Sequence, residues 1–171
     1  MIQYRRNVFE TNSSSTHAIC INNTPTKSFR KFITFGFEDF GWETLEDRDP
    51  YNYLWTAINS VYANDRDKRE EWKEHLSALC QSKGCKCEFL EGSFASYDWN
   101  NKTFYYLSNA SIDHDDELTG MLEDLFSNET LLEHYLTDCD IVTGNDNSCD
   151  DLVGDFYDAR VGICTCYWKG N

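Results

Sequence analysis

Five cysteines stand in two short groups whose spacing suits a metal ion. Cys80, Cys85 and Cys87 lie close together, and Cys164 and Cys166 form a Cys-x-Cys pair near the C-terminus. Residues two apart in a strand point to the same face, so the thiols of each Cys-x-Cys pair converge. Four thiolates satisfy one tetrahedral Zn²⁺, and two segments brought together by a fold can supply them. The sequence therefore predicts a structural zinc held by four of these five cysteines.

Two other interpretations of these cysteines stay open. Free cysteine is among the most buried residue types, so the thiols also fit ordinary packing, and redox chemistry is a third interpretation. Cys20, Cys139 and Cys149 stand alone and are interpreted as packing residues. The first residues lack the apolar stretch of a signal peptide, so we expect a cytoplasmic protein. In that reducing compartment, clustered thiols bind metal more often than they form disulfides.

Residues 9–17 read Phe-Glu-Thr-Asn-Ser-Ser-Ser-Thr-His and place hydroxyl groups beside an imidazole. A nucleophilic site would pair one serine with the histidine as its base. Residues this close in sequence seldom reach that geometry, and a polar loop whose hydroxyls bond backbone amides explains the same string. The candidate catalytic residues of this segment are Ser13, Ser14, Ser15 and His17, with Asn12 as an oxyanion donor.

Residues 113–117, Asp-His-Asp-Asp-Glu, also have two interpretations. His114 between carboxylates can act as a base or bind a metal, which makes it a further catalytic candidate. The same acids can instead cap the helix that follows and complement its dipole. Residues 144–147, Gly-Asn-Asp-Asn, are interpreted as a tight turn that could rim a polar pocket with His114.

The chain of 171 residues carries 30 Asp and Glu against 15 Lys and Arg, a formal charge of −15. Like charge disfavours free nucleic acid and anionic membranes as partners and favours a basic macromolecule. A run of acids is often no more than a solvated face. The sharper interpretation is that carboxylates imitate phosphates and occupy a basic nucleic-acid channel of another protein. The candidate partner-binding residues are Asp138, Asp140, Asp146, Asp150, Asp151, Asp155 and Asp158.

The pattern of apolar residues predicts the elements that position these groups. With 40% hydrophobic residues, 11 Phe, 10 Tyr and 5 Trp, the chain is expected to fold, and no linker marks a boundary within residues 1–171. Strands and helices mix without regular alternation, so we predict one α+β domain with a mixed or antiparallel sheet and three to four helices. The expected strands are 17–21, 29–37, 85–90, 94–99, 103–107, 140–143 and 161–168, and the expected helices begin near residues 50, 65, 118 and 128.

The string Phe-Glu-Thr-Asn-Ser-Ser-Ser-Thr-His, preceded by Arg-Arg-Asn-Val and followed later by Ile112-Asp113-His114 and residues 144–147, resembles a group of small proteins of phages and of phage-derived regions in Gram-positive bacteria. The likeness covers most of the chain in order. Small acidic phage proteins of this kind are also similar to anti-CRISPR proteins. That resemblance implies a zinc-containing inhibitor in the host bacterial cytoplasm that binds an RNA-guided type II CRISPR nuclease and blocks DNA loading. It assigns no residue roles, because anti-CRISPR proteins share no common motif.

Two alternatives to an inhibitor stay open. One is an enzyme whose Ser and His residues modify a host target. The other is a structural phage component.

Overall fold

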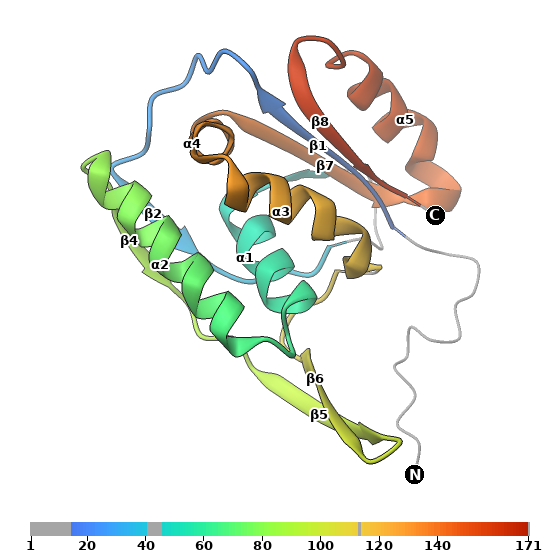
Figure 1. Cartoon of the computed structure of the whole chain (residues 1–171). Helices are drawn as coiled ribbons and strands as arrows, with labels where there is room; N and C mark the ends of the chain where they lie inside the picture. Colours follow the sequence, from blue (N-terminus) through green and yellow to red (C-terminus); the bar gives the residue numbers. More distant parts are fainter. Residues whose placement is uncertain (1–14, 41–45, 113, 171) are drawn as a thin grey trace.

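The centre of the molecule is a four-stranded antiparallel sheet in the order β3-β7-β1-β8 (Figure 1). The structure is a computed structural model that describes residues 15–40, 46–112 and 114–170. Strand β1 is central and is buried along almost its whole length, including its polar residues Ser15, Thr16 and His17. The strands are β3 (Glu46–Arg48), β7 (Cys139–Asn145), β1 (Ser15–Asn22) and β8 (Cys164–Lys169).

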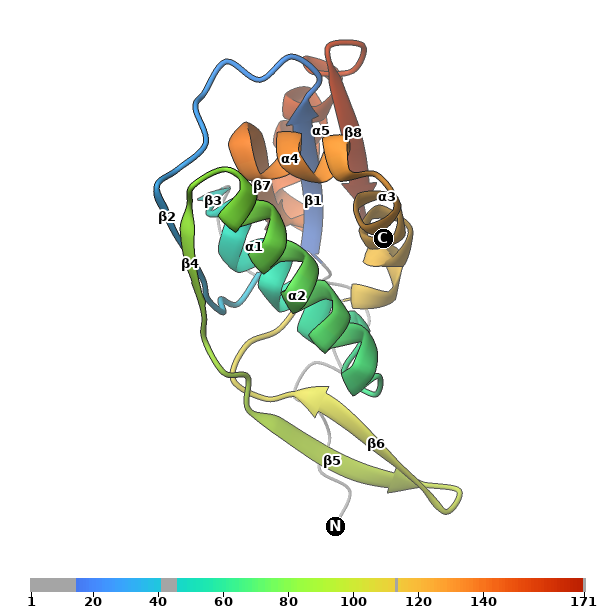
Figure 2. The ribbon, with the colours of Figure 1, turned by 60° about the vertical axis from the view of Figure 1, so that its left-hand side comes forward.

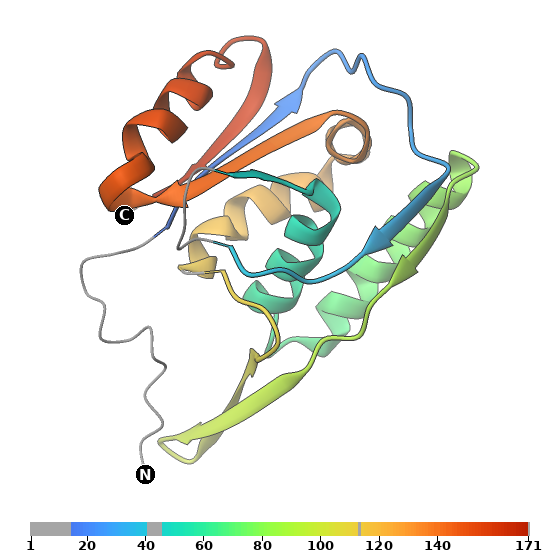
Figure 3. The ribbon, with the colours of Figure 1, turned by 180° about the vertical axis from the view of Figure 1, so that it is seen from behind.

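Helices cover both faces of this sheet (Figures 1 and 3). On one face lie α1 (Pro50–Val61), α3 (Thr119–Ser127) and α4 (Glu129–Thr137), which pack against Ile19 and Ile21 of β1. On the other face α5 (Asp146–Asp158) packs its Val153 against Ala18 and Val142. The period-2 alternation of β1 therefore feeds two separate apolar clusters.

Helix α2 (Arg66–Ser82) lies outside α1 and packs against a second, smaller sheet (Figure 2). That sheet consists of the parallel strands β2 (Phe32–Phe35) and β4 (Lys86–Phe89). The start of α1 is as expected, because the Asp49 side chain accepts hydrogen bonds from the backbone amides of Tyr51 and Asn52 and Pro50 occupies the first turn. The α2 end is also as expected, since Gly84 just beyond it has a φ of +69°.

A two-stranded hairpin of β5 (Phe94–Trp99) and β6 (Lys102–Leu107) projects from the body (Figures 1, 2 and 3). Its turn residues Asn100 and Asn101 have φ values of 49° and 62°. Two consecutive left-handed residues are the signature of the tight turn that the sequence predicts here.

The α+β class with an antiparallel sheet is confirmed, but the expectation of three to four helices is wrong, because the described residues form five α-helices. The missed helix is α5, and residues 144–147 are therefore not a tight turn: Gly144 and Asn145 end β7, and Asp146 begins α5. Gly144 permits this direct junction, since a Cβ there would lie 2.6 Å from the Cβ of Cys149. The short charged strand β3 was also not expected.

None of the helices in the described part of the chain has both the length and the hydropathy to cross a bilayer.

Candidate functional site

The outward side of α5 is a row of exposed carboxylates. The helix contacts β1 and β7 through its apolar residues, so its acids are directed to solvent. At about 100° per residue, the three acids Asp151, Asp155 and Asp158 fall within roughly 60° of one another on the helix wheel, and Asp150 is about 80° from Asp158. The helix contains no Lys or Arg. We call the exposed residues Asp150, Asp151, Asp155 and Asp158 the acidic face of α5.

These charges oppose the stability of their own helix. Asp155 and Asp158 lie near the C-terminus of α5, where the helix dipole is negative and no basic residue is present in the last turn. Asp151 and Asp155 are also a like-charge pair at i and i+4, which costs a few tenths of a kcal/mol, about 0.2–0.5. Arg160, two residues beyond the helix, offsets part of this cost, because its guanidinium donates to the Phe156 carbonyl at 3.2 Å. The acidic face itself adds nothing to the stability of α5.

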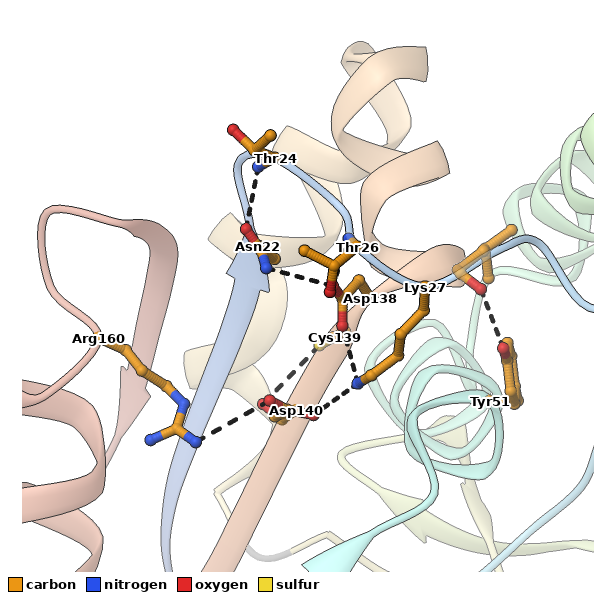
Figure 4. A network of polar contacts seen from close by, with 10 residues as sticks. Asn22, Thr24, Thr26, Lys27, Tyr51, Asp138, Cys139, Asp140 and Arg160 are labelled. Carbon is orange, nitrogen blue, oxygen red and sulfur yellow. Dashed lines mark hydrogen bonds and ion pairs between the residues drawn. The ribbon is translucent and has the colours of Figure 1, made fainter.

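Two of the acids proposed for partner binding, Asp138 and Asp140, form ion pairs with basic residues of the same chain. Lys27 Nζ lies 2.7 Å from Asp138 Oδ1 and 3.0 Å from Asp140 Oδ1 (Figure 4). The Asp138 side chain is only 5% exposed and also accepts hydrogen bonds from Asn22 and from Thr26. Asp140 is exposed but faces the guanidinium of Arg160 at 3.9 Å. Asp138 therefore stabilises the fold, and the side chain of Asp146 lies outside the described part.

The pKa of Asp138 is lowered from 3.8 to about 2. Burial alone would raise it, but hydrogen bonds from Lys27 and Thr26 and the Lys27 charge outweigh that effect. A carboxyl group with a depressed pKa contributes stability that is complete above its unfolded-state pKa and is lost as the pH falls through the folded-state value. That window runs from about pH 4 down to about pH 2 for Asp138.

Replacing Asp138 with Asn is therefore expected to lower the free energy of unfolding by about 2 kcal/mol at pH 7, because hydrogen bonds to a charged group are lost. The difference between Asp138→Asn and wild type should shrink as the pH falls from about 4 towards 2. Urea unfolding across this range checks it. The matched control is Asp140→Asn, whose exposed side chain should change stability far less. Equal effects of the two substitutions would contradict this account of Asp138.

A cavity of about 640 Å³ lies beside this network, between β7, the start of α1 and the end of α5. Its lining combines four cationic side chains with three carboxylates, so no single sign of charge dominates. Each cation has an acidic neighbour: Lys27 and Arg160 contact Asp140, Arg30 is 3.9 Å from Asp49, and Arg48 is 2.9 Å from Glu38. The cavity therefore offers no clear preference for an anionic ligand.

The Ser and His candidates do meet, in a buried network at the start of β1. His17 Nε2 lies 2.8 Å from Ser15 Oγ, and His17 Nδ1 lies 2.6 Å from the Tyr53 hydroxyl of α1. Lys169 of β8 donates from Nζ to the Ser15 carbonyl at 2.9 Å and to Ser15 Oγ at 3.2 Å. The expectation that neighbours in sequence would not reach this geometry is wrong, since residues two apart in a strand share a face.

Burial makes this network a poor catalytic site. Ser15, His17, Tyr53 and Lys169 are all 0% exposed. Burial, followed by the charges of Lys169 and Arg48, lowers the pKa of His17 well below its usual value. The imidazole is therefore neutral, and it bridges Ser15 and Tyr53. Because these side chains are fully buried, a substrate has no path to them in the described structure.

The other catalytic candidates do not join the network in the described residues. His114 is exposed and precedes a short 3₁₀ helix, Asp115–Leu118, in a left-handed conformation with a φ of 51°. Its side chain makes no capping hydrogen bond to that helix. Ser13 and Ser14, together with Asn12, lie outside the described residues.

The five cysteines proposed for zinc form two sets on different sheets. Cys80, at the end of α2, is close to Cys85 and Cys87 at the start of the β4 segment. Burial is the largest cause of the raised pKa of Cys80, and the neighbouring thiols of Cys87 and Cys85 raise it further. Cys164 and Cys166 lie on β8 beside β1. The strands β4 and β8 are at opposite sides of the molecule in all three ribbon views (Figures 1, 2 and 3). The arrangement does not fit one zinc site made from both sets.

Cys20, interpreted from sequence as a packing residue, belongs with the β8 pair. It lies directly opposite Cys166 in the β1–β8 ladder. Asn23 N donates to Ile163 O, so by alternation the Cys20–Cys166 pair is a non-hydrogen-bonded one, in which side chains approach most closely. Burial and then the contact with Cys166 raise the pKa of Cys20. Sequence spacing could not show this neighbour, because it depends on the strand order.

Zinc binding itself stays a prediction. Within the described ranges no group of three or more His, Cys, Asp and Glu residues is arranged to hold a metal ion. If a structural zinc ion stabilises the fold, protein purified without chelator should contain about one equivalent of zinc, as measured by elemental analysis. Removing the metal should then lower the melting temperature. A content below half an equivalent would reject the zinc prediction.

No protein-family model matches the chain, and neither a curated protein nor a solved structure matches it.

Proposed function

We propose that this protein is a non-catalytic binding protein whose acidic face of α5 docks onto the basic, nucleic-acid-binding surface of another protein. The observation that carries the proposal is the position of Asp150, Asp151, Asp155 and Asp158 on the solvent side of a helix whose other side packs on the sheet. Rows of carboxylates on a rigid element imitate the phosphates of a nucleic-acid backbone and speed association with a basic surface.

The total charge supports the same kind of partner. At −15, the molecule repels nucleic acid and attracts a protein that binds nucleic acid. An RNA-guided type II CRISPR nuclease, the partner implied by the likeness to anti-CRISPR proteins, has such a surface and is the first one to test. The protein would then compete with DNA for the nuclease.

The test is a titration of DNA cleavage by a purified type II CRISPR nuclease loaded with guide RNA. We expect inhibition to be complete near one inhibitor per nuclease and to weaken as salt rises. Inhibition at far below one inhibitor per nuclease would refute a binding mechanism and favour an enzyme. Lack of any inhibition would reject this nuclease as the partner.

The enzyme alternative has one observation in its favour, the 2.8 Å contact between Ser15 Oγ and His17 Nε2. The complete burial of both side chains argues against it. We therefore assign this network to stability.

A further inference from the structure

The β5–β6 hairpin, which we call the finger, projects from the body into solvent (Figure 2). It pairs with no other strand in the described structure, and an isolated two-stranded hairpin is marginally stable in water. The middle of β6 is held, however, by Asn64 at the turn between α1 and α2. The Asn64 side chain accepts from Tyr105 N at 2.6 Å and donates to Tyr105 O at 2.9 Å. Anchoring of this kind removes part of the ordering cost of binding.

One face of this finger is aromatic. In the register of the hairpin Tyr97 lies opposite Phe104, and Trp99 lies opposite Lys102, so these side chains share a face. The ring of Tyr97 is 5.6 Å from that of Phe104 and 6.2 Å from that of Tyr106. Tyr97 is 50% exposed and Trp99 is 65% exposed. Tyr and Trp are the residue types that most often anchor protein interfaces.

A cavity of about 580 Å³ opens at the base of the finger, next to the end of α1 and the 3₁₀ helix. Tyr97, Tyr105 and Tyr106 are among the residues that line it, together with Asp39 and Asp115. By strand alternation, Tyr97 and Tyr106 share one face of the hairpin and Tyr105 lies on the other. Asp39 is oriented by a hydrogen bond from the Ser111 hydroxyl at 3.1 Å. Among the described residues that line this cavity there is no Lys, Arg or His.

We infer that the finger and this cavity form a docking surface for a basic protein and that the cavity receives an arginine side chain of that partner. A guanidinium group stacks on aromatic rings and gives paired hydrogen bonds to carboxylates, whereas a lysine ammonium has no plane to stack. A nucleic acid is disfavoured, because the lining and the whole chain are negative. The inference rests on the proposed function for the kind of partner, but it names a different surface from the acidic face of α5.

The probe is the blocked tripeptide acetyl-Gly-Arg-Gly-amide, titrated into the ¹⁵N-labelled full chain and followed by NMR. Its lysine counterpart and its neutral citrulline counterpart are the matched ligands. We expect the arginine peptide to shift amide signals around the cavity, those of residues 105–112 and of Asn64. We expect the lysine peptide to bind at least about threefold more weakly and the citrulline peptide to cause no saturable shift.

Two double variants that remove the same charge distinguish binding in this cavity from non-specific attraction to an acidic protein. Asp39→Asn combined with Asp115→Asn should weaken the arginine peptide at least about fivefold, because two charged acceptors are lost. Glu70→Gln combined with Glu74→Gln removes the same charge from the exposed side of α2 and should leave the affinity unchanged. Tyr97→Leu, which retains an apolar side chain on the hairpin, should also weaken binding at least about threefold by removing the ring.

Three outcomes would overturn the inference: equal binding of the citrulline peptide, equal loss of affinity in both double variants, or shifts centred away from the cavity. The same spectra report whether each variant is folded, so a loss of binding cannot be mistaken for unfolding. Because this test uses no partner protein, its failure leaves the proposal for α5 standing, and failure of the α5 proposal leaves this result standing.

Discussion

Reversal of Asp150, Asp151 and Asp155 to Lys is expected to slow association with a basic partner by about tenfold or more at low salt. The three changes move the formal charge from −15 to −9, since each adds two units. All three residues are exposed on α5, so the fold should be retained. Because long-range attraction governs encounter more than it governs the bound state, the dissociation rate should change less than the association rate. Stopped-flow mixing at several salt concentrations measures both rates.

The control for this experiment carries the same total charge. Glu70, Glu71 and Glu74 are exposed on α2, and their reversal to Lys also gives −9. If the position of the charges matters, the α2 variant should associate nearly as fast as wild type. Equal slowing in both variants would show that net charge alone governs association and would remove the special role of α5.

Loss of the His17 side chain is expected to lower the free energy of unfolding by about 1–3 kcal/mol. His17→Leu removes the 2.6 Å contact of the Tyr53 hydroxyl and the 2.8 Å contact of the Ser15 hydroxyl. Ser15 Oγ keeps its hydrogen bond from Lys169 Nζ at 3.2 Å, so the cost of a buried group without a partner falls on Tyr53. Since domains are stable by only about 5–15 kcal/mol, the urea midpoint should fall clearly.

The lowered pKa of His17 is also expected to make the stability of the wild-type protein depend on pH. Burial, followed by Lys169 and Arg48, keeps the pKa of His17 well below the unfolded-state value of 6.5. The unfolded chain therefore binds a proton that the folded chain does not, so stability is complete above about pH 6.5 and declines below it. Below pH 6.5, the free energy of unfolding should therefore fall by at most about 1.4 kcal/mol per pH unit because of this one group.

Urea unfolding at pH 8, 7, 6 and 5.5 checks this prediction. His17→Leu should lose the decline below pH 6.5, whereas Tyr53→Phe, which removes one hydroxyl but keeps the imidazole, should retain it. The same decline in His17→Leu as in wild type would show that His17 is not its source. A folded His17→Leu that binds its partner normally would also retire His17 as a catalytic residue.

Local signals in the sequence were sufficient for most elements. The cap at Asp49 and Pro50 marks the start of α1 because both act within one turn. The pair Asn100 and Asn101 marks the hairpin because both residues tolerate the left-handed backbone of its turn. Helix α5 was missed since its apolar residues are separated by Gly154 and by acids, and its stability depends on packing against Ala18 and Val142 far away in the chain.

Which side chains meet could not be read from spacing. The thiols of Cys164 and Cys166 share a face, as expected for a strand, but strand order places them beside Cys20 rather than beside Cys87. In the same way, Asp138 looked like one acid among many, and only the fold shows that Lys27 holds it in the interior. Non-local pairing decides these contacts, and a single sequence carries little information about it.

The most direct test of the central claim compares two tagged proteins in a host lysate. Wild type and the α5 variant with Asp150, Asp151 and Asp155 changed to Lys are incubated with the lysate at low and at high salt, and the retained proteins are identified by mass spectrometry. We expect wild type to retain a basic, nucleic-acid-binding protein at low salt, high salt to release it, and the variant to retain much less of it at low salt. Equal retention of that protein by both at low salt would contradict the claim that the carboxylates of α5 make the contact.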